Sequence, residues 1–180
     1  MTGPDGETED IAEGGMAPAA TASADTEPRN RLQYAALPFR VGDDGAVEVL
    51  LITSRTTRRW IIPKGWPMGK LAPRKVAATE ASEEAGVEGS TSRRPIGRYG
   101  YDKVLSNGTT VRCAVDVYAL EVQKQRSSWP ERKRRERRWV PVEEAADMVS
   151  DTELAAIVRA FATQSAAEQA AIGSGAITLA

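Results

Sequence analysis

The sequence predicts an α/β layered sandwich, and three patterns carry this prediction. Two β-rich runs joined by a glycine- and aspartate-rich turn open the predicted domain. A helix bounded by Pro73 and Gly86 comes next, and a second predicted hairpin and two further helices follow it. Strands that frame helices in this mixed order are typical of a sheet with helices packed on it.

Three strands are predicted in the first part of the domain. Residues 33–41 and 47–53 are rich in apolar and β-branched side chains, and the turn at 42–45 between them predicts a hairpin. Pro38 cannot donate a backbone hydrogen bond, so it predicts that the first strand lies at a sheet edge or carries a bulge. A short third strand is predicted at 60–62.

The helix that follows has clear boundary signals. Pro73 fits the first helical turn, where its missing N–H costs nothing, and Gly86 fits the position just past the C-terminal end. The Asn107-Gly108 pair predicts a hairpin between strands at 96–104 and 111–122. The last predicted elements are a short strand at 139–140 and helices at about 142–149 and 151–163.

The composition excludes several kinds of active site. The chain has 41% hydrophobic and 27% charged residues, as a globular domain does. Its single cysteine, Cys113, cannot form an internal disulfide, which excludes a cross-linked secreted scaffold. The absence of histidine excludes a Ser-His or Cys-His nucleophile pair and an imidazole metal ligand. Any metal ligands would be oxygen atoms, which favours Mg²⁺ or Mn²⁺.

The formal net charge of −1 conceals an uneven distribution of charge. Residues 1–30 have a net charge of −6 and no apolar periodicity, so we expect them to form a disordered acidic tail. Residues 31–180 have a net charge of +5. We place the domain at 31–163 and expect 164–180 to form an Ala-rich C-terminal tail.

The sequence contains no targeting or membrane signal. The first thirty residues lack the basic start and apolar run of a signal peptide, and they are too acidic for a transit peptide. No segment approaches the roughly 18 consecutive apolar residues that a membrane span needs. We therefore expect a cytoplasmic protein that does not span a membrane.

Three glutamates mark the helix that ends at Gly86. At about 100° per residue, Glu80, Glu83 and Glu84 span about 100° of the helix circumference, so their carboxylates crowd one face. Like charges at this spacing repel, and the negative end of the helix dipole adds to the cost. One interpretation is a solvated acidic face, and the other is a set of ligands for a divalent cation.

The wider spacing resembles the Nudix box, G-x5-E-x7-R-E-U-x-E-E-x-G-U, where U is an apolar residue. The matching positions hold Gly65, Glu80, Glu83, Glu84 and Gly86. The resemblance implies a Nudix-type α/β/α sandwich with a mixed β-sheet between helices. It also implies that the three glutamates are the catalytic residues and the ligands of Mg²⁺ or Mn²⁺.

Two positions depart from this box. Leu71 stands where the family has its first Glu, and Thr79 stands where the family has an Arg that orients the carboxylates. The missing positive charge would have to come from Lys75 or from a basic residue elsewhere in the chain.

Within this family, the sequence is most similar to the diphosphoinositol polyphosphate phosphohydrolase branch. In that branch, a strand ending in small hydroxyl residues and Arg leads into R-W-I-x-P-x-G, and a basic cluster ending in an aromatic residue precedes the last helix. Here Lys64 and Trp66 interrupt what is a glycine run in the branch. The resemblance implies that the substrate is bound by Thr53, Ser54, Arg55, Arg59, Lys64, Gly65, Arg135 and Arg137.

The basic cluster at 126–138 contains seven basic and two acidic residues. One interpretation is a solvated loop. A nucleic-acid-binding arm is disfavoured, because aromatic residues are not interleaved with the bases and the whole chain is not basic. We favour an electrostatic funnel for a polyphosphate, since Arg binds phosphate in a bidentate manner. Weaker candidates for the same role are Arg98, Lys103 and Arg112 on the predicted hairpin.

These features together predict a pyrophosphohydrolase dependent on Mg²⁺ or Mn²⁺. Its substrate would be an anionic small molecule such as a nucleoside-diphosphate-X, a dinucleoside polyphosphate or an inositol pyrophosphate. One of the three glutamates, or a loop acid such as Glu131 or Glu136, would activate the attacking water. The alternative is a binding module of the same fold that senses a phosphorylated ligand or nucleic acid without cleaving it, and Thr79 and Leu71 favour that alternative.

Overall fold

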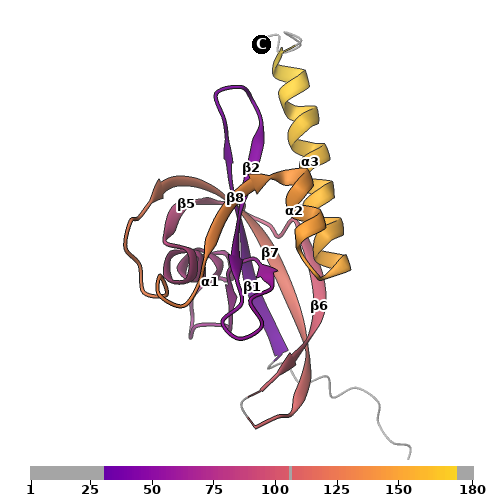
Figure 1. Cartoon of the computed structure of the whole chain (residues 1–180). Coiled ribbons are helices and arrows are strands. Elements are labelled where there is room, and N and C mark those ends of the chain that lie inside the picture. The colour runs from indigo at the N-terminus through magenta and orange to yellow at the C-terminus, as the bar shows by residue number, and fades with distance from the viewer. Residues whose placement is uncertain (1–30, 106, 174–180) are drawn as a thin grey trace, which may run out of the picture.

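A mixed β-sheet forms the centre of the fold in the computed structural model, which describes residues 31–105 and 107–173, with side chains to residue 165 (Figure 1). The middle strand, β1 (Leu32–Val41), is parallel to β7 (Thr110–Gln125) and antiparallel to β2 (Val47–Thr53). Within the described residues the sheet has eight strands. The tail expected at 1–30 and the chain beyond residue 173 lie outside the described residues.

Five shorter strands complete the sheet. Besides β1, the strand β2 pairs with β3 (Trp60–Ile61) and β8 (Arg137–Pro141), and β4 (Lys64–Gly65) pairs with β1. The long strand β7 pairs with both β5 (Val87–Thr91) and β6 (Gly97–Val104). Because β4 is hydrogen-bonded to the central strand, the loop that contains Gly65 is fixed to the sheet.

Helices cover both faces of this sheet (Figure 1). On one face, α1 (Pro73–Glu80) continues directly into a π-helical turn, η2 (Ala81–Ala85). On the other face lie α2 (Val142–Met148) and α3 (Thr152–Gly173). The predicted α/β/α sandwich with a mixed sheet between helices is therefore confirmed.

Each face of the sheet has its own hydrophobic core. Alternate residues of β2 show the division, because side chains along a strand point to opposite faces. Leu50 and Ile52 pack in the core beneath α1, whereas Val49 and Leu51 pack in the core beneath α2 and α3. All four side chains are fully buried, so β2 is an interior strand that both layers share.

A stripe of alanines along α1 and η2 faces the sheet. Ala77, Ala81 and Ala85 have no exposed surface and lie in the core beneath the helix. Small side chains at these positions allow the helix backbone to approach the sheet closely. Gly86 ends the helix in the left-handed conformation, with φ of 67°, which glycine adopts without steric cost. Because the alanines occupy the side of the helix that packs on the sheet, the three glutamates lie on a different side of it.

Three features of the fold are absent from the sequence-based prediction. The strand β4 is only two residues long, too short to give an apolar alternation. The strand β5 contains Gly89, where the pairing with β7 shifts register and where a Cβ atom would lie 1.8 Å from the carbonyl oxygen of Glu121. The π-helical turn is the third feature, and such turns are frequent at functional sites.

The prediction of an edge strand or bulge at Pro38 is wrong. The strand β1 has partners on both sides. The backbone N–H of Ala36 donates to the carbonyl oxygen of Pro63 on the β4 side, so the nitrogen of Pro38, two residues on, faces the same side. There the pairing with β4 has ended at Ala35 and the pairing with β2 begins only at Phe39, so no hydrogen bond is lost.

The last helix runs further than the domain boundary proposed at residue 163. Its backbone stays helical to Gly173, across the first part of the expected C-terminal tail. In the described part of the chain, no helix combines the length and the apolar character needed to cross a membrane.

Candidate active site

Glu84 is the most buried acid of the helix. It is only 8% exposed, and its Oε1 atom forms an ion pair with the guanidinium of Arg135. Its Oε2 atom accepts a hydrogen bond of 3.1 Å from the backbone N–H of Lys64 in β4. Burial raises the pKa of Glu84, while Arg135 and the Lys64 N–H oppose that rise. Both carboxylate oxygens are therefore oriented by partners from other segments.

Glu80 lies against the glycine of the box loop. A Cβ atom at Gly65 would lie 1.7 Å from Oε1 of Glu80, so the absent side chain is what makes room for this carboxylate. Burial raises the pKa of Glu80 to about 7, and the neighbouring carboxylates of Glu84, Glu83 and Glu131 add to the rise. Gly65, which the sequence suggested for substrate binding, thus contacts a proposed metal ligand directly.

The donor atoms at this helix fit a hard divalent cation in their chemistry. Glu83 is exposed, Glu80 half-buried and Glu84 buried, so the three acids range from solvent to the protein interior. Their mutual repulsion, which raises the pKa of Glu80, is what a bound cation would relieve. Among the described residues, no three acidic or cysteine side chains are gathered closely enough to form a complete metal site. The residues fit Mg²⁺ or Mn²⁺ as oxygen donors.

A cavity of about 540 Å³ opens beside Glu84 and contains most of the predicted substrate-binding residues. Its lining includes a cationic set from four separate segments, which comprises Arg55, Arg59, Lys64, Lys103 and Arg135. Ser54 also lines it, and its hydroxyl lies 2.6 Å from that of Thr57 and accepts a hydrogen bond of 3.1 Å from the Arg59 N–H. The lining also includes two acids, Glu84 and Asp102, but its five cationic side chains outnumber them, and this positive balance suits an anionic substrate.

Besides Gly65, two further predicted substrate-binding residues, Thr53 and Arg137, lie outside this lining. Thr53 is buried, its hydroxyl accepts a hydrogen bond of 2.9 Å from the Glu136 N–H, and its carbonyl oxygen accepts one of 3.0 Å from Arg135. The Arg137 guanidinium stacks 3.9 Å from the ring centroid of Trp129 and donates to the carbonyl oxygen of Ala85 at 2.7 Å. Their substrate contacts remain predictions.

Tyr101 and Gln33 are cavity residues that sequence reasoning missed. The Tyr101 hydroxyl donates to Oε1 of buried Gln33 at 2.5 Å, and the Lys64 ammonium lies 5.0 Å from the Tyr101 ring centroid. Burial lowers the pKa of Lys64 to about 8, while Glu84 opposes the fall. One signal was available, because the polar Gln33 directly precedes a run of apolar residues in β1, and a buried amide needs a partner.

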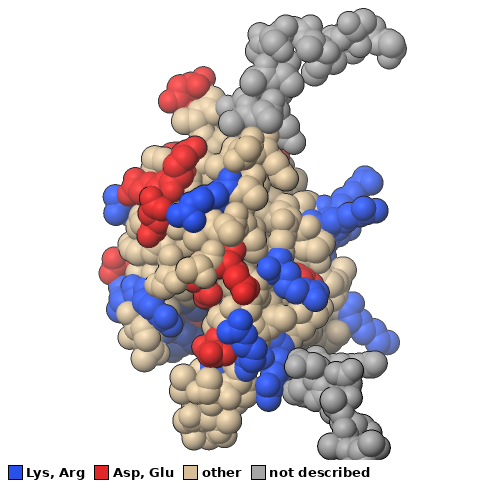
Figure 2. All heavy atoms as spheres, turned by 90° about the vertical axis from the view of Figure 1, so that its right-hand side faces the viewer, with Lys and Arg blue, Asp and Glu red and all other residues tan. Residues whose placement is uncertain are grey.

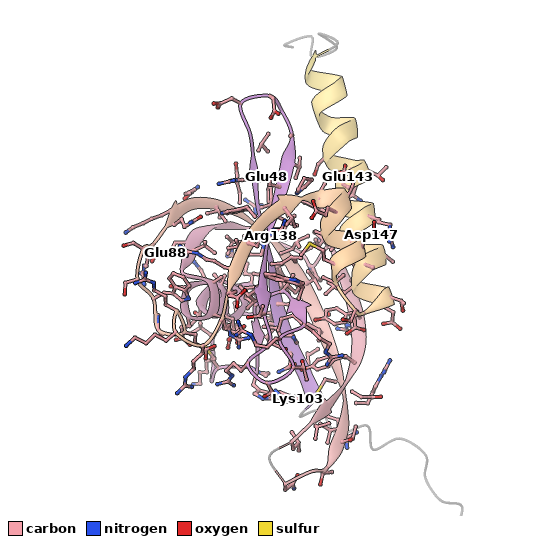
Figure 3. The ribbon with its side chains drawn as sticks, viewed as in Figure 1. Glu48, Glu88, Lys103, Arg138, Glu143 and Asp147 are labelled. Atoms are coloured by element: carbon pink, nitrogen blue, oxygen red, sulfur yellow. The ribbon has the colours of Figure 1, made fainter. Side chains whose placement is uncertain are left out.

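Basic side chains are more concentrated in the lining of this cavity than on the face of the protein formed by α2 and α3 (Figure 2). Figure 2, which views the α2 and α3 side, shows acidic and basic side chains interspersed over that face. Lys103 from β6 lies toward the end of the sheet away from the β1–β2 hairpin (Figure 3). Its ammonium lies 4.7 Å from the ring centroid of Trp66, so the box loop and β6 meet at the cavity.

A sequence model of the NUDIX domain matches residues 31–161, which is more than half of the chain. The chain belongs to the Nudix family.

Relatives with curated descriptions are plant Nudix hydrolases. Nudix hydrolase 12, mitochondrial, of Arabidopsis thaliana is 35% identical over 57% of this chain and 52% of that protein. Nudix hydrolase 16, mitochondrial, of the same plant is 32% identical over 67% of this chain and 73% of that protein. The chain thus spans about half the length of the first of these relatives. The matches support the family and do not support the diphosphoinositol branch, and the cytoplasmic location remains a prediction.

Solved structures share the Nudix fold at low sequence identity. A binary complex of the C. elegans Ap4A hydrolase has a TM-score of 0.57 and 18% identity, over 76% of this chain and 98% of that chain. The NUDIX domain of Shewanella oneidensis NrtR, complexed with ADP ribose, has a TM-score of 0.55 and 16% identity, over 82% and 94% of the two chains. At these identities, the likeness concerns the fold alone.

The Nudix helix is braced at its C-terminal end by the segment between β7 and β8. The indole N–H of Trp129 donates to the Glu84 carbonyl oxygen at 3.2 Å, and the Glu131 N–H donates to that of Glu83 at 3.2 Å. The Arg126 N–H donates to the Gly86 carbonyl oxygen at 2.8 Å. These donors satisfy carbonyl groups that a helix end leaves without partners. The basic cluster therefore holds the helix as well as carrying charge.

Proposed function

We propose that this Nudix protein hydrolyses a diphosphate linkage in an anionic polyphosphate small molecule, with Mg²⁺ or Mn²⁺ as cofactor. The observation that carries the proposal is the position of Glu84 in the lining of the cationic cavity of about 540 Å³, with the carboxylate of Glu80 near that of Glu84. A diphosphate substrate needs both cationic side chains for its phosphate oxygens and acidic ligands for a divalent ion. The chain offers both within one site.

Each group of residues has a distinct task in this proposal. Arg55 and Arg59 line the open side of the cavity, where their planar guanidinium groups would bind phosphate oxygens. Lys64 places a further ammonium over Tyr101, deeper in the cavity. Glu80, Glu83 and Glu84 would hold the metal ion. When bound, that ion would neutralise charge that develops on the diphosphate during hydrolysis.

The acid that takes the proton from the attacking water would come from the helix or from Glu131. Glu131 is half-buried beside the site, paired with Arg135 at 2.5 Å and with Arg55 at 3.6 Å. Glu136 is less suited, because its side chain is 69% exposed and paired with Arg58. A base must lie within hydrogen-bonding reach of the water it activates, so we favour Glu131 over Glu136 among the loop acids.

A smaller side cavity favours a substrate with a flat group. It has a volume of about 120 Å³, and its lining includes Trp60, Tyr99, Tyr101 and the carboxylate-bearing Asp151. The two cavities share lining residues, among them Lys64 and Tyr101. An aromatic wall suits a nucleobase, whereas a phosphorylated inositol has no flat face to place there. We therefore favour nucleoside polyphosphates and nucleoside-diphosphate-X compounds over inositol pyrophosphates.

Hydrolysis is tested by incubating the full chain with Mg²⁺ or Mn²⁺ and four substrate classes. These are dinucleoside polyphosphates, ADP-ribose, nucleoside triphosphates and an inositol pyrophosphate, with products separated by ion-exchange chromatography. We expect metal-dependent cleavage of a nucleoside substrate. Glu80→Gln should lower kcat by about a hundredfold or more, because an amide is a poorer metal ligand than a carboxylate.

Glu143→Gln is the matched control, since Glu143 lies on α2, on the opposite face of the sheet from α1 (Figure 3). Its kcat should equal that of the wild type. Saturable binding of a nucleotide without product release at any concentration of either metal would reject hydrolysis. That outcome would identify the chain as a binding module of the Nudix fold, which Thr79 and Leu71 favour.

A further inference from the structure

The Nudix helix lacks a positive charge at position 79. Thr79 is half-buried there, and its hydroxyl donates to the carbonyl oxygen of Lys75 at 2.9 Å, so it neither carries charge nor reaches a carboxylate. Burial of Glu84 without a compensating partner would be costly. The partner comes from elsewhere in the chain.

Arg135 supplies a guanidinium to this helix from just before β8. Its side chain is 5% exposed and contacts three groups. The NH2 group pairs with Oε1 of Glu84, Nε donates to Oε2 of Glu131 at 2.5 Å, and NH1 donates to the Thr53 carbonyl oxygen at 3.0 Å. One buried arginine thus joins the helix, the basic loop and the end of β2.

The segment that carries Arg135 is itself fixed to the protein. The Arg135 N–H donates to the Glu131 carbonyl oxygen at 3.1 Å, and the Thr53 N–H donates to that of Glu136 at 3.0 Å. The guanidinium has little freedom to move, because both its backbone and its end are hydrogen-bonded. An arginine fixed in this way can set the direction of the carboxylate with which it pairs.

We propose that Arg135 is the positioning residue for Glu84 and takes over the part that the box arginine has in the Nudix family, in place of Thr79. The proposal rests on the proposed function, because Glu84 is assigned there as a metal ligand. Arg135 fixes Oε1 of Glu84, and the Lys64 N–H fixes Oε2. Glu84 is thereby oriented before any cation arrives, and loss of one partner would release the carboxylate.

The first measurement is the affinity for Mn²⁺, obtained by electron paramagnetic resonance titration of the full chain without substrate. Arg135→Met should weaken Mn²⁺ binding by about 10- to 100-fold, as is usual when a residue that orients a metal ligand is removed. Arg98→Met is the control, because Arg98, a weaker candidate for phosphate binding in the sequence, lies outside the cavity lining and forms a bidentate pair with Asp116 at 2.6 and 3.0 Å. It should lower the melting temperature and leave the Mn²⁺ affinity unchanged.

The second measurement needs no metal. The Lys64 amide proton reports the position of Glu84, since it donates to Oε2. In Arg135→Met its hydrogen exchange should accelerate by about tenfold or more, and in Arg98→Met it should match the wild type relative to global stability. Unchanged Lys64 exchange in Arg135→Met, or Mn²⁺ binding as tight as in the wild type or tighter, would overturn the proposal. A wild type that binds Mn²⁺ and hydrolyses nothing would refute the proposed function and leave the part of Arg135 intact.

Discussion

Gly65 allows a sharp test of the site, because its missing side chain makes room for Glu80. A Cβ atom at Gly65 would lie 1.7 Å from Oε1 of Glu80 and 2.2 Å from its Cδ, whereas ordinary Cβ contacts begin at 3.4 Å. In Gly65→Ala, the carboxylate would have to move by about 1.7 Å or more to reach van der Waals distance. A misplacement of about 1 Å costs about a hundredfold in rate, so kcat should fall by at least that factor.

The same substitution should leave the fold intact. The atoms that a Cβ would meet at Gly65 are the end of the Glu80 side chain, which can rotate away, and no backbone atom is among the three nearest. Gly65 also has no positive φ, so alanine adopts its backbone conformation without strain. We expect a melting temperature within a few degrees of the wild type, measured by thermal unfolding alongside initial rates with Mn²⁺.

Gly69→Ala is the control for a second glycine in the same loop. Gly69 has φ of 53° and no atom within 4 Å of the position of a Cβ, so alanine adds strain without a clash. It should cost about 1 kcal/mol of stability and leave kcat unchanged. Wild-type kcat in Gly65→Ala would refute the reasoning, as would a crystal structure of that variant with the Glu80 carboxylate in its original place.

Three further predictions concern stability. Burial lowers the pKa of Lys64 to about 8, so between pH 8 and 10.5 the unfolded chain binds more protons at this residue than the folded chain does. The contribution of Lys64 to the free energy of unfolding therefore rises with pH across that window, whereas the raised pKa values of Cys113 and Tyr101 act in the opposite direction. In urea titrations at pH 8 and 10, the stability of the wild type relative to Lys64→Met should rise with pH. Trp129→Phe removes the indole donor to the Glu84 carbonyl oxygen and replaces the ring that stacks on Arg137 with a smaller one. It should cost about 1 kcal/mol or more and lower the melting temperature by about 2–4 °C, and an unchanged melting temperature would contradict a bracing contact. Tyr101→Phe leaves the buried Gln33 amide oxygen without its donor, and chemical denaturation should show a loss of about 1–3 kcal/mol.

Local signals accounted for most of the fold. The glycine- and aspartate-rich turn, the Asn107-Gly108 turn, and the Pro73 and Gly86 helix boundaries each depend on a few adjacent residues, and each lies where expected. The parallel pairing of β1 with β7 and the short strand β4 carry no such local signal. Both pairings form between segments that are distant in the sequence. The position of Pro38 has the same origin, because it lies between the part of β1 that pairs with β4 and the part that pairs with β2.

The candidate site likewise contains residues that the sequence identified and residues that only the structure brings together. The spacing of the box identified the glutamates, since residues on one helix are related by a fixed rotation per residue. The spacing also identified Gly65, but it did not explain why glycine is needed there. The explanation is that the Glu80 carboxylate lies where a side chain at position 65 would be. Tyr101 and Gln33 were missed, because their hydrogen bond joins β6 to β1 across 68 residues of chain.

The sequence by itself determined the Nudix family, the glutamate helix and the absence of any histidine ligand, since these depend on composition and short-range spacing. It also showed that Thr79 leaves the helix without its usual positive charge. Only the tertiary structure decided which residue supplies that charge, because Arg135 and Glu84 are 51 residues apart and meet through the packing of β8 beside β2. A buried ion pair depends on position in space, and no spacing along the chain encodes it.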